Sequence, residues 1–354
     1  MAKVNRDFLE PEVAVSIARR ELAEFEANDP SSLAGYFPSL EVNDVEYEID
    51  TGGSDGMITA ANWRMFNGNT TSEKWGEGQA SRGRLMPLSR NFTLDEETRL
   101  RMRNDAKDAI QLESAKLVRR ATRAIALQVN YQRANALANG KVDIHGSGGL
   151  RQTIDFGRDP RLTTTAPLLF SAPTADPLAQ IEADADLYEE INGFRPETVL
   201  MSSEVRRIIS THPTVVLGAT GDPNRPRASV TELQALFDQY DLPRIVNLPT
   251  NKVKVDNLDT AETEVRNLFE KDKLIYAPAS GNPLDPEAAL FGRTLWGATL
   301  SGDTAEFGLA NSDLPGIVAA VIEEGWPSHL EIIADAIAMP VAFSPNYTMT
   351  VKVL

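Results

Sequence analysis

The sequence predicts an α+β fold for this chain of 354 residues, and three observations support that prediction. Between Pro87 and Gly140 the chain has no glycine or proline, which is typical of one long helix. The segment before this run mixes many glycines with large apolar side chains. After it, short strand patterns alternate with helices, and residues 347–354 alternate strictly between apolar and polar, as a strand in a sheet does.

The first 50 residues predict a helix, an arm and a strand. Residues 8–27 have the apolar spacing of an amphipathic helix, and Asn28-Asp29-Pro30 stops it. Residues 30–44 are rich in turn-forming residues around a few apolar anchors, so we expect an arm that lies on another surface. The pattern at 45–50 alternates apolar and polar residues and predicts a half-buried strand.

Residues 51–90 fit neither a solvated linker nor a compact core. Seven glycines are interleaved with large apolar side chains, among them Trp63, Phe66 and Trp75. A two-stranded ribbon is marginal in water by itself. We therefore expect a long β-tongue whose apolar face is buried on a neighbouring copy of the chain.

The long helix is expected over 94–138. Thr93 and Glu96 have the spacing of a capping box, and Asn139-Gly140 supplies a left-handed stop. At about 1.5 Å per residue such a helix spans roughly 65 Å. A compact globule of this chain length is only about 50 Å across. Either the helix breaks, most plausibly at Asn104-Asp105, or the subunit is elongated, and we favour the elongated form.

The rest of the chain predicts a mixed sequence of helices and strands. Asp176-Pro177 and Ser229-x-x-Glu232 are helix starts, and Asn192-Gly193 is a helix stop. The expected helices are 176–192, 203–210 and 230–240, and the expected strands are 141–144, 152–156, 198–201, 244–247, 252–256, 273–277, 289–300, 316–323, 330–338 and 347–354.

Composition excludes several classes of protein. The chain has no cysteine, no apolar run long enough for a bilayer, and no signal-peptide core at its start, so we expect a chain made in the cytoplasm without a membrane partner. A net charge of −16 argues against a dedicated nucleic-acid binder. The charge is uneven, because residues 41–55 and 176–190 each carry six acids and no base.

Basic residues concentrate elsewhere, and two interpretations of this pattern stay open. Residues 64–90 hold five bases against two acids, and the long helix adds nine more. These are either solvated faces that keep the protein soluble or surfaces that meet acidic patches of another copy.

Catalytic chemistry has no convincing signature. No spacing typical of a metal site, a nucleophile elbow or a nucleotide fingerprint occurs. His212 is expected at a helix end, where an imidazole contacts the last carbonyls. The acids Asp184, Asp186, Glu189 and Glu190 are interpreted as the exposed face of a helix rather than a cation site. We expect no catalytic residue, no cofactor and no metal, and therefore no enzyme.

The order of segments resembles a known family. The specific pieces are the helix end with Gln132, Arg133, Ala136, Leu137, Gly140 and Lys141, and the strand with Asp155, Phe156, Gly157 and Arg158. With the arm, the glycine-rich loop and the helix opened by Asp176-Pro177, these pieces resemble the major capsid proteins of lambda-like tailed bacteriophages (the major capsid protein E family), which adopt the HK97 fold.

The resemblance implies a domain organisation. It makes 1–44 an N-terminal arm, 45–92 an extended loop over the adjacent subunit, and 93–177 a peripheral domain with the spine helix at 94–138. Residues 178–320 become an axial domain near the capsomer centre, and 321–354 return to the peripheral domain.

The resemblance also implies a function and partners. The protein would assemble into hexamers and pentamers of an icosahedral shell that encloses double-stranded DNA without reading its sequence, in the host cytoplasm and then in the virion. With only about 45 residues before the loop, a separate scaffolding protein is expected, besides a portal and a decoration protein.

Assembly contacts are expected from the loop and the spine helix. The loop residues are Trp63, Arg64, Phe66, Lys74, Trp75, Arg82 and Arg84, and the spine residues are Arg119, Arg120 and Arg123. Lys74 follows Glu73, which would keep its amine protonated, so we expect shells without covalent cross-links.

Two alternatives from other classes remain at this point. An encapsulin nanocompartment protein would share the fold but enclose cargo enzymes. An acidic cytoplasmic hydrolase would need a site that the sequence does not display.

Overall fold

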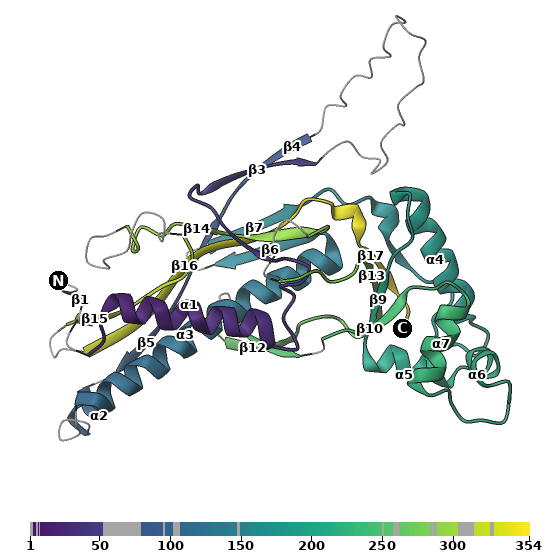
Figure 1. Cartoon of the computed structure of the whole chain (residues 1–354), viewed down its shortest axis with the longest axis horizontal. Coiled ribbons are helices and arrows are strands. Elements are labelled where there is room, and N and C mark those ends of the chain that lie inside the picture. Colours follow the sequence, from purple (N-terminus) through teal and green to yellow (C-terminus); the bar gives the residue numbers. More distant parts are fainter. Residues whose placement is uncertain are drawn as a thin grey trace, which may run out of the picture.

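The computed structural model describes residues 3–4, 6, 8–51, 79–94, 96–101, 107–146, 149–249, 251–257, 262–283, 285, 289–303, 315–325 and 329–354. A long sheet with two helices along it forms one end of the molecule, and a smaller helix-rich unit forms the other (Figure 1). The molecule is elongated, as the length of the predicted helix led us to expect.

The long sheet is built around one strand, β16, whose residues are His329–Ala342. It has the order β1-β15-β16-β14-β2, with β5 paired to β16 as well. The partner strands are β1 (Lys3–Val4), β2 (Ser39–Glu41), β5 (Met86–Leu94), β14 (Gly292–Gly297) and β15 (Val318–Glu324). Alternate residues of β16 from Leu330 to Ala338 are buried, which is the period of a strand with one face on the core.

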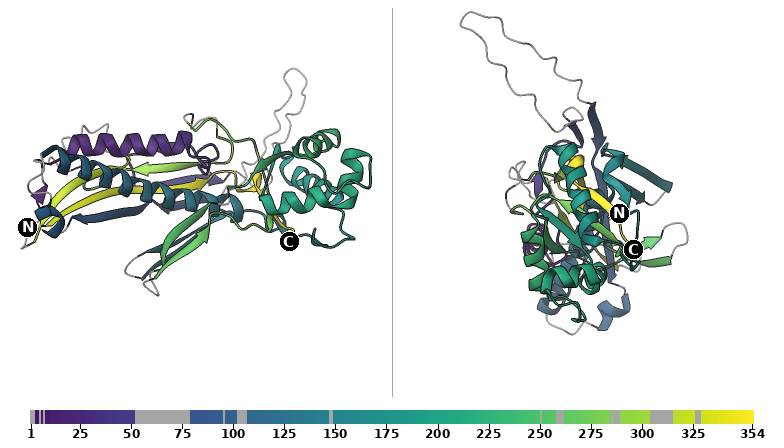
Figure 2. Two further views of the ribbon diagram at one scale, coloured as in Figure 1. Left: turned by 90° about the horizontal axis from the view of Figure 1, so that it is seen from below. Right: turned by 90° about the vertical axis from the view of Figure 1, so that its right-hand side faces the viewer.

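Helices α1 (Pro11–Asn28) and α3 (Lys107–Asn139) lie side by side along this sheet (Figure 2). Small buried residues such as Ala14 and Ala18 on α1 and Ala121 on α3 let the helices approach the sheet closely. Their apolar stripes and the inward residues of β16 form one hydrophobic core. At 33 residues, α3 is about 50 Å long and forms the spine of this half.

The start of the spine differs from the sequence prediction. Thr93 and Leu94 belong to β5 and pair with Glu331 and Leu330 of β16, so they do not cap a helix. Helix α2 (Glu96–Arg101) begins two residues later. A capping pattern depends only on neighbouring residues. Here the pairing of β5 with β16, which joins residues far apart in sequence, determines the structure of Thr93 and Leu94 instead. The suggested break at Asn104-Asp105 lies outside the described residues.

The end of α3 explains the helix-end and strand motifs found in the sequence. Gly140 has φ of +64°, and a Cβ there would stand 2.9 Å from the Cβ of Arg158. Arg158 donates from Nη2 to the carbonyl of Ala138 at 2.9 Å and to Oγ1 of Thr163 at 2.8 Å. Burial lowers the pKa of Arg158 to about 10. The buried guanidinium thus closes the helix and ties it to the next segment.

After α3 the chain forms the hairpin β6 (Lys141–Gly146) and β7 (Leu150–Asp155), close to the expected strands. Lys141 and Asp155 form an ion pair of 2.9 Å at its base. The carboxylate of Asp155 also accepts the backbone N–H of Gly157 at 2.9 Å, where φ is +79°. The sequence Asp-Phe-Gly-Arg is therefore a turn motif that brings Arg158 to the end of α3.

Arg133 is buried in the middle of the molecule, with 1% of its side chain exposed. Its Nη2 donates to Glu26 of α1 at 2.5 Å and its Nε to Oγ1 of Thr294 of β14 at 2.8 Å. Ser39 donates to the same carboxylate at 2.7 Å and accepts from Nε1 of Trp296 at 2.9 Å. Our sequence analysis counted Arg133 among the surface bases of the helix; instead it joins α1, α3, β2 and β14.

The helix-rich unit has a sheet of its own, with the order β10-β9-β13-β17-β8. Its strands are β8 (Thr163–Thr165), β9 (Thr198–Met201), β10 (Arg244–Asn247), β13 (Lys273–Ala277) and β17 (Met349–Lys352). Its helices are α4 (Pro177–Asn192), α5 (Ser203–Thr211), α6 (Pro213–Thr220) and α7 (Val230–Gln239). Short 3₁₀ turns at Pro160–Leu162 and Pro345–Tyr347 lead into β8 and β17.

Two strands pair across the long distances that separate the expected domains. β14, expected in the axial domain, lies in the long sheet, and β17, expected in the peripheral domain, lies in the five-stranded sheet. Both placements come from pairing between distant segments, because β14 pairs with β16 across 40–50 positions and β17 pairs with β13 across 73–79 positions.

Several capping signals were predicted correctly. Asp176 caps α4 by accepting the N–H groups of Leu178 and Ala179, and Gly193 ends it with φ of 79°. Ser229 and Glu232 form the capping box of α7. The sequence analysis missed helix α6 and four strands: β1, β2, β8 and β12 (Glu262–Asn267).

The acidic face predicted on α4 is wrong for one residue. Asp184 is buried, with 4% exposed, and accepts from the hydroxyl of Tyr276 at 2.9 Å and from Nε2 of Gln180 at 2.7 Å. Burial raises the pKa of this carboxyl to about 6. Asp186 and Glu189 stay at the surface and pair with Arg195.

We expect Asp184→Asn to stabilise the protein above pH 6 by about 2–3 kcal/mol, since one pKa unit corresponds to about 1.4 kcal/mol. The folded-state pKa of Asp184 is raised, so its contribution to stability is full below its unfolded pKa and is lost as the pH rises through about 6. Asparagine removes the charge and can bond to both neighbours once the Gln180 amide rotates. Urea unfolding at pH 4 and pH 8 measures the difference, which should vanish at pH 4. The exposed Asp186→Asn is the matched control, and an equal gain in it would contradict the prediction.

Candidate assembly interface

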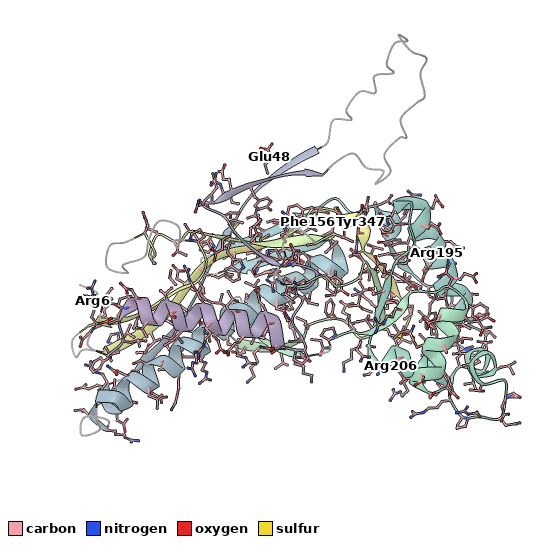
Figure 3. The ribbon with its side chains drawn as sticks, in the orientation of Figure 1. Arg6, Glu48, Phe156, Arg195, Arg206 and Tyr347 are labelled. Carbon is pink, nitrogen blue, oxygen red and sulfur yellow. The ribbon has the colours of Figure 1, made fainter. Side chains whose placement is uncertain are left out.

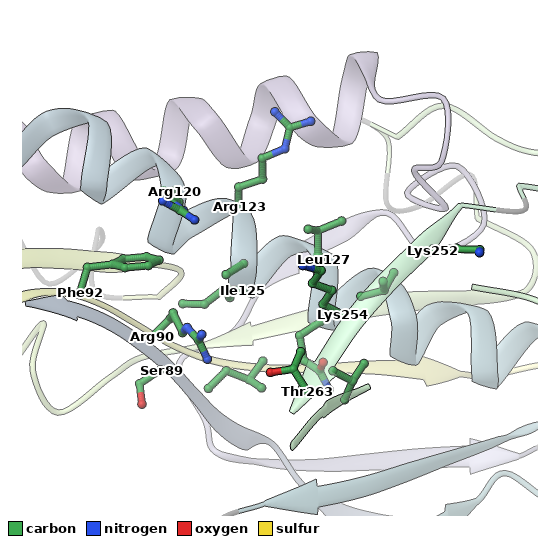
Figure 4. Close-up of a pocket in the computed structure, with 15 residues that line it drawn as sticks. Ser89, Arg90, Phe92, Arg120, Arg123, Ile125, Leu127, Lys252, Lys254 and Thr263 are labelled. Carbon is green, nitrogen blue, oxygen red and sulfur yellow. The ribbon is translucent and has the colours of Figure 1, made fainter. Parts of the chain in front are cut away.

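A groove of about 660 Å³ lies along the exposed side of α3, between β5 and the hairpin of β11 (Lys252–Asn257) and β12 (Glu262–Asn267). This hairpin stands out from the body of the molecule (Figure 2). The groove is lined by three segments that are far apart in sequence: the hairpin, α3 and β5 (Figure 4).

The groove has an apolar floor and a basic rim. Ile125 and Val253 are buried and Phe92 is half-buried at its floor. Five bases and no carboxylate are among the described residues that line it. The bases are Arg90, Arg120, Arg123, Lys252 and Lys254. In a chain of net charge −16 such a lining forms a local positive field.

Secondary structure places these bases on one side. Arg120 and Arg123 are three residues apart on α3 and so share one face of the helix. Lys252 and Lys254 alternate with Val253 on β11, so both lysines are exposed while the valine is buried. The helical period of α3 and the two-residue period of β11 thus place the basic side chains on the exposed face of each element and the apolar side chains on the buried face.

Two contacts fix the arginines. The guanidinium carbon of Arg120 lies 5.2 Å from the centre of the Phe92 ring, which is a cation–π contact. Arg123 Nη2 lies 3.3 Å from a carboxylate oxygen of Asp29 at the end of α1. Within the described part of the chain, Arg120, Lys252 and Lys254 form no ion pair. Their charge remains available to another molecule.

A second hollow of about 450 Å³ lies on the other side of Arg123 and is acidic. It is lined by Glu21, Glu24 and Asp29 at the end of α1. Acidic and basic hollows therefore adjoin along the face of α1 and α3.

The opposite edge of the molecule carries an acidic ribbon. Strands β3 (Glu46–Thr51) and β4 (Gln79–Arg84) form a separate two-stranded sheet that projects from the upper edge in Figure 1, whereas β5 and β12 lie along the lower one. Asp44, Glu46 and Glu48 are exposed on or just before β3, and Glu41 is exposed at the end of β2. Residues 41–48 contain no base, although Glu46 pairs with Arg84 of the facing strand. Figure 3 shows Glu48 on this ribbon.

The structure brings together only some of the predicted assembly residues. Arg120 and Arg123 line the groove, while Arg119 is exposed outside it. Arg84 pairs with Glu46 of its own ribbon at 2.9 Å. The backbone of Arg82 lies in β4, but its side chain is outside the described residues. Trp63, Arg64, Phe66, Lys74 and Trp75 are outside them too, so the loop contacts and the absence of cross-links stay predictions.

Sequence reasoning missed Lys252 and Lys254 as interface candidates. The pattern Lys-Val-Lys-Val was available, and it indicates two lysines on one face of a strand. Nothing local indicated that this face would meet α3.

The described part of the chain contains no cluster of three His, Cys, Asp or Glu side chains that could hold a metal ion. None of its helices combines the length and the apolar character needed to cross a bilayer.

The long helix under an elongated sheet, the smaller helix-rich unit and the projecting ribbon define an HK97-type shell protein. The chain belongs to the family described as phage major capsid protein E, whose profile matches residues 48–273. That match includes the ribbon, α3, the groove and most of the helix-rich unit.

Solved structures show the same fold at low sequence identity. A prophage protein of Escherichia coli CFT073, assigned as a capsid protein, is 16% identical and aligns over 100% of both chains with a TM-score of 0.62. A phage-related protein of Bordetella bronchiseptica RB50 is 14% identical and aligns over 99% of this chain and 98% of its own, with a TM-score of 0.57. No curated protein matches the chain in sequence.

Membership in this family decides between the classes left open by the sequence. The chain is a phage major capsid protein rather than an encapsulin, and its role is structural. It is a component of the virion capsid.

Proposed function

We propose that the protein forms the hexamers and pentamers of an icosahedral shell around the double-stranded DNA of a tailed phage. Copies join head to tail, with the acidic ribbon of one copy meeting the basic groove of the next. The observation that carries this proposal is the position of the two surfaces on opposite edges of one subunit. A contact between unlike surfaces that closes on itself generates a ring.

The chemistry of the two surfaces supports their pairing. The groove offers a basic rim over an apolar floor, and residues 41–48 combine exposed acids with the apolar Val42 and Val45. A nucleic acid would bind the basic rim of the groove through its phosphates but would leave the apolar floor without a partner. We propose that Trp63, Phe66 and Trp75 of the loop extend the apolar part of this contact and that Arg119 lies at its border. The bases Arg64, Lys74, Arg82 and Arg84 meet acidic groups of the neighbouring copy outside the groove.

A division into domains goes with this function. We propose that residues 1–44 act as the arm, that the ribbon begins the extended loop, and that the long sheet with α1 and α3 is the peripheral domain. The helix-rich unit with its five-stranded sheet is the axial domain. Each part has a hydrophobic core of its own, and a third cluster that includes Leu137, Leu200 and Ile275 joins them, with β14 counted as peripheral and β17 as axial.

The remaining partners follow from the same proposal. A separate scaffolding protein, a portal and a decoration protein act with this subunit, assembly takes place in the host cytoplasm, and the chain carries no catalytic activity and no cofactor.

Co-expression with the phage scaffold tests the function. We expect closed particles of uniform diameter in negative-stain images, because the ribbon and the groove of every subunit are both bound to a neighbouring copy. Light scattering on the same preparation should show no large population of free subunits. A folded protein, judged by circular dichroism, that stays monomeric under these conditions would overturn the proposal.

A further inference from the structure

A second basic site lies in the helix-rich unit, away from the groove. A pocket of about 250 Å³ opens between α5 and the segment that leads into α7. Three arginines and three serines line it, and Figure 3 shows Arg206 among them at the lower end of this unit. The six residues are Ser203, Arg206, Arg207, Ser210, Arg227 and Ser229.

The local fold makes these side chains converge. Ser203, Arg206, Arg207 and Ser210 have the spacing i, i+3, i+4 and i+7, which is one face of α5. The N–H of Ala228 donates to the carbonyl of Ser210 at 2.8 Å and holds the neighbouring segment against the end of the helix. Buried Ala228 and Leu233 close the bottom of the pocket.

The pocket has positive charge without an acidic counterpart. No carboxylate is among the described residues that line it, and Arg207 and Arg227 form no ion pair with any of them. Arg206 donates to the side-chain carbonyl of Asn247 and leaves its other donors free to bond. Three guanidinium groups repel one another unless an anion lies between them.

Glu232, an acid in the first turn of α7, already has its partners. The carboxylate of Glu232 accepts the N–H of Ser229 at 2.8 Å and Nη1 of Arg225 at 2.7 Å. These bonds hold the pKa of Glu232 at about 2. Composition does not explain the cluster either, because residues 160–248 contain twelve acids and only seven arginines, three of which line this one pocket.

We propose that this pocket binds a phosphate group. Arginine presents a planar fork of donors that matches phosphate oxygens, and serine hydroxyls complete the set around a tetrahedral anion. The volume accommodates one such group together with its waters. This site is independent of the assembly contact, and its ligand is either a free phosphate or a phosphate of the DNA backbone.

Calorimetric titration of the purified full-length chain with inorganic pyrophosphate, at constant ionic strength, tests the proposal. We expect saturable binding with one site per chain. Arg207→Ala with Arg227→Ala should weaken it at least about tenfold, because two of the three charged donors to the phosphate are removed. Circular dichroism checks that the double variant is folded, as expected for two exposed residues.

The matched control is Arg119→Ala with Arg244→Ala, which removes the same charge from exposed positions outside the pocket and should bind as the parent does. No saturable binding, equal weakening in the control, or citrate binding as tightly as pyrophosphate would overturn the proposal. Competition with a short DNA duplex identifies the source: displacement of pyrophosphate means a backbone phosphate, and no displacement means a free one. Because the readout is binding rather than shell formation, its outcome is separate from that of the proposed function.

Discussion

Replacing Arg133 with alanine is expected to lower the free energy of unfolding by about 3–5 kcal/mol, the range measured when one partner of a buried ion pair is removed. Glu26, with 12% of its side chain exposed, would keep a buried charge without its partner. Thr294 would lose the donor at 2.8 Å, and a cavity would open between α1, α3 and β14. Urea unfolding of unassembled subunits measures the loss.

A second substitution separates charge from packing. Glu26→Gln in the Arg133→Ala background removes the stranded charge and should recover part of the lost stability. Arg119→Ala, on the exposed side of the same helix, is the matched control and should leave the unfolding midpoint unchanged. A loss below about 1 kcal/mol in Arg133→Ala would mean that water or a neighbouring group replaces the guanidinium.

Reversing two charges in the groove is expected to prevent shell formation. Arg120→Glu with Lys254→Glu turns attraction for an acidic neighbour into repulsion at every subunit contact. An exposed pair contributes less than about 1 kcal/mol, but each ring and the whole shell repeat the contact, so the yield of particles should fall by tenfold or more. Sedimentation of the co-expressed products measures that yield.

The control variant makes the same change in net charge at two positions outside the groove. Arg244→Glu with Lys271→Glu changes two exposed bases outside the groove and should assemble as the parent does. Adding Glu48→Lys to the groove variant restores one attractive contact and should recover some particles. Normal assembly of the groove variant, or equal failure of the control, would remove the groove from the interface.

The parts of the fold that could be predicted from sequence are those with local causes. Helix α4 and strands β9, β10 and β13 have the expected bounds, because caps, turns and apolar periods act over a few residues. The stop at Gly140 has the same kind of cause. The family resemblance added the shell fold, which no local pattern establishes.

The parts that could not be predicted depend on residues distant in sequence. The burial of Arg133 and Asp184 follows from Glu26 and Tyr276, each about 90 or more positions away. The groove needs α3 and β11 side by side, and the sequence indicated only the arginines of the helix. Charge counts along a chain do not distinguish a surface base from one that holds the core together.

The position of β17 has a consequence for how the subunit is made. This strand, 349–352, lies between β13 and β8 inside its sheet, yet it is the last of the five strands to leave the ribosome. At roughly 5–20 residues per second, β8 waits on the order of 10–40 s for its only partner. Until then the edge of β13 is bare, so a nascent subunit is prone to wrong pairing and unfit to join a shell. Synthesis itself therefore delays assembly until β17 has been made.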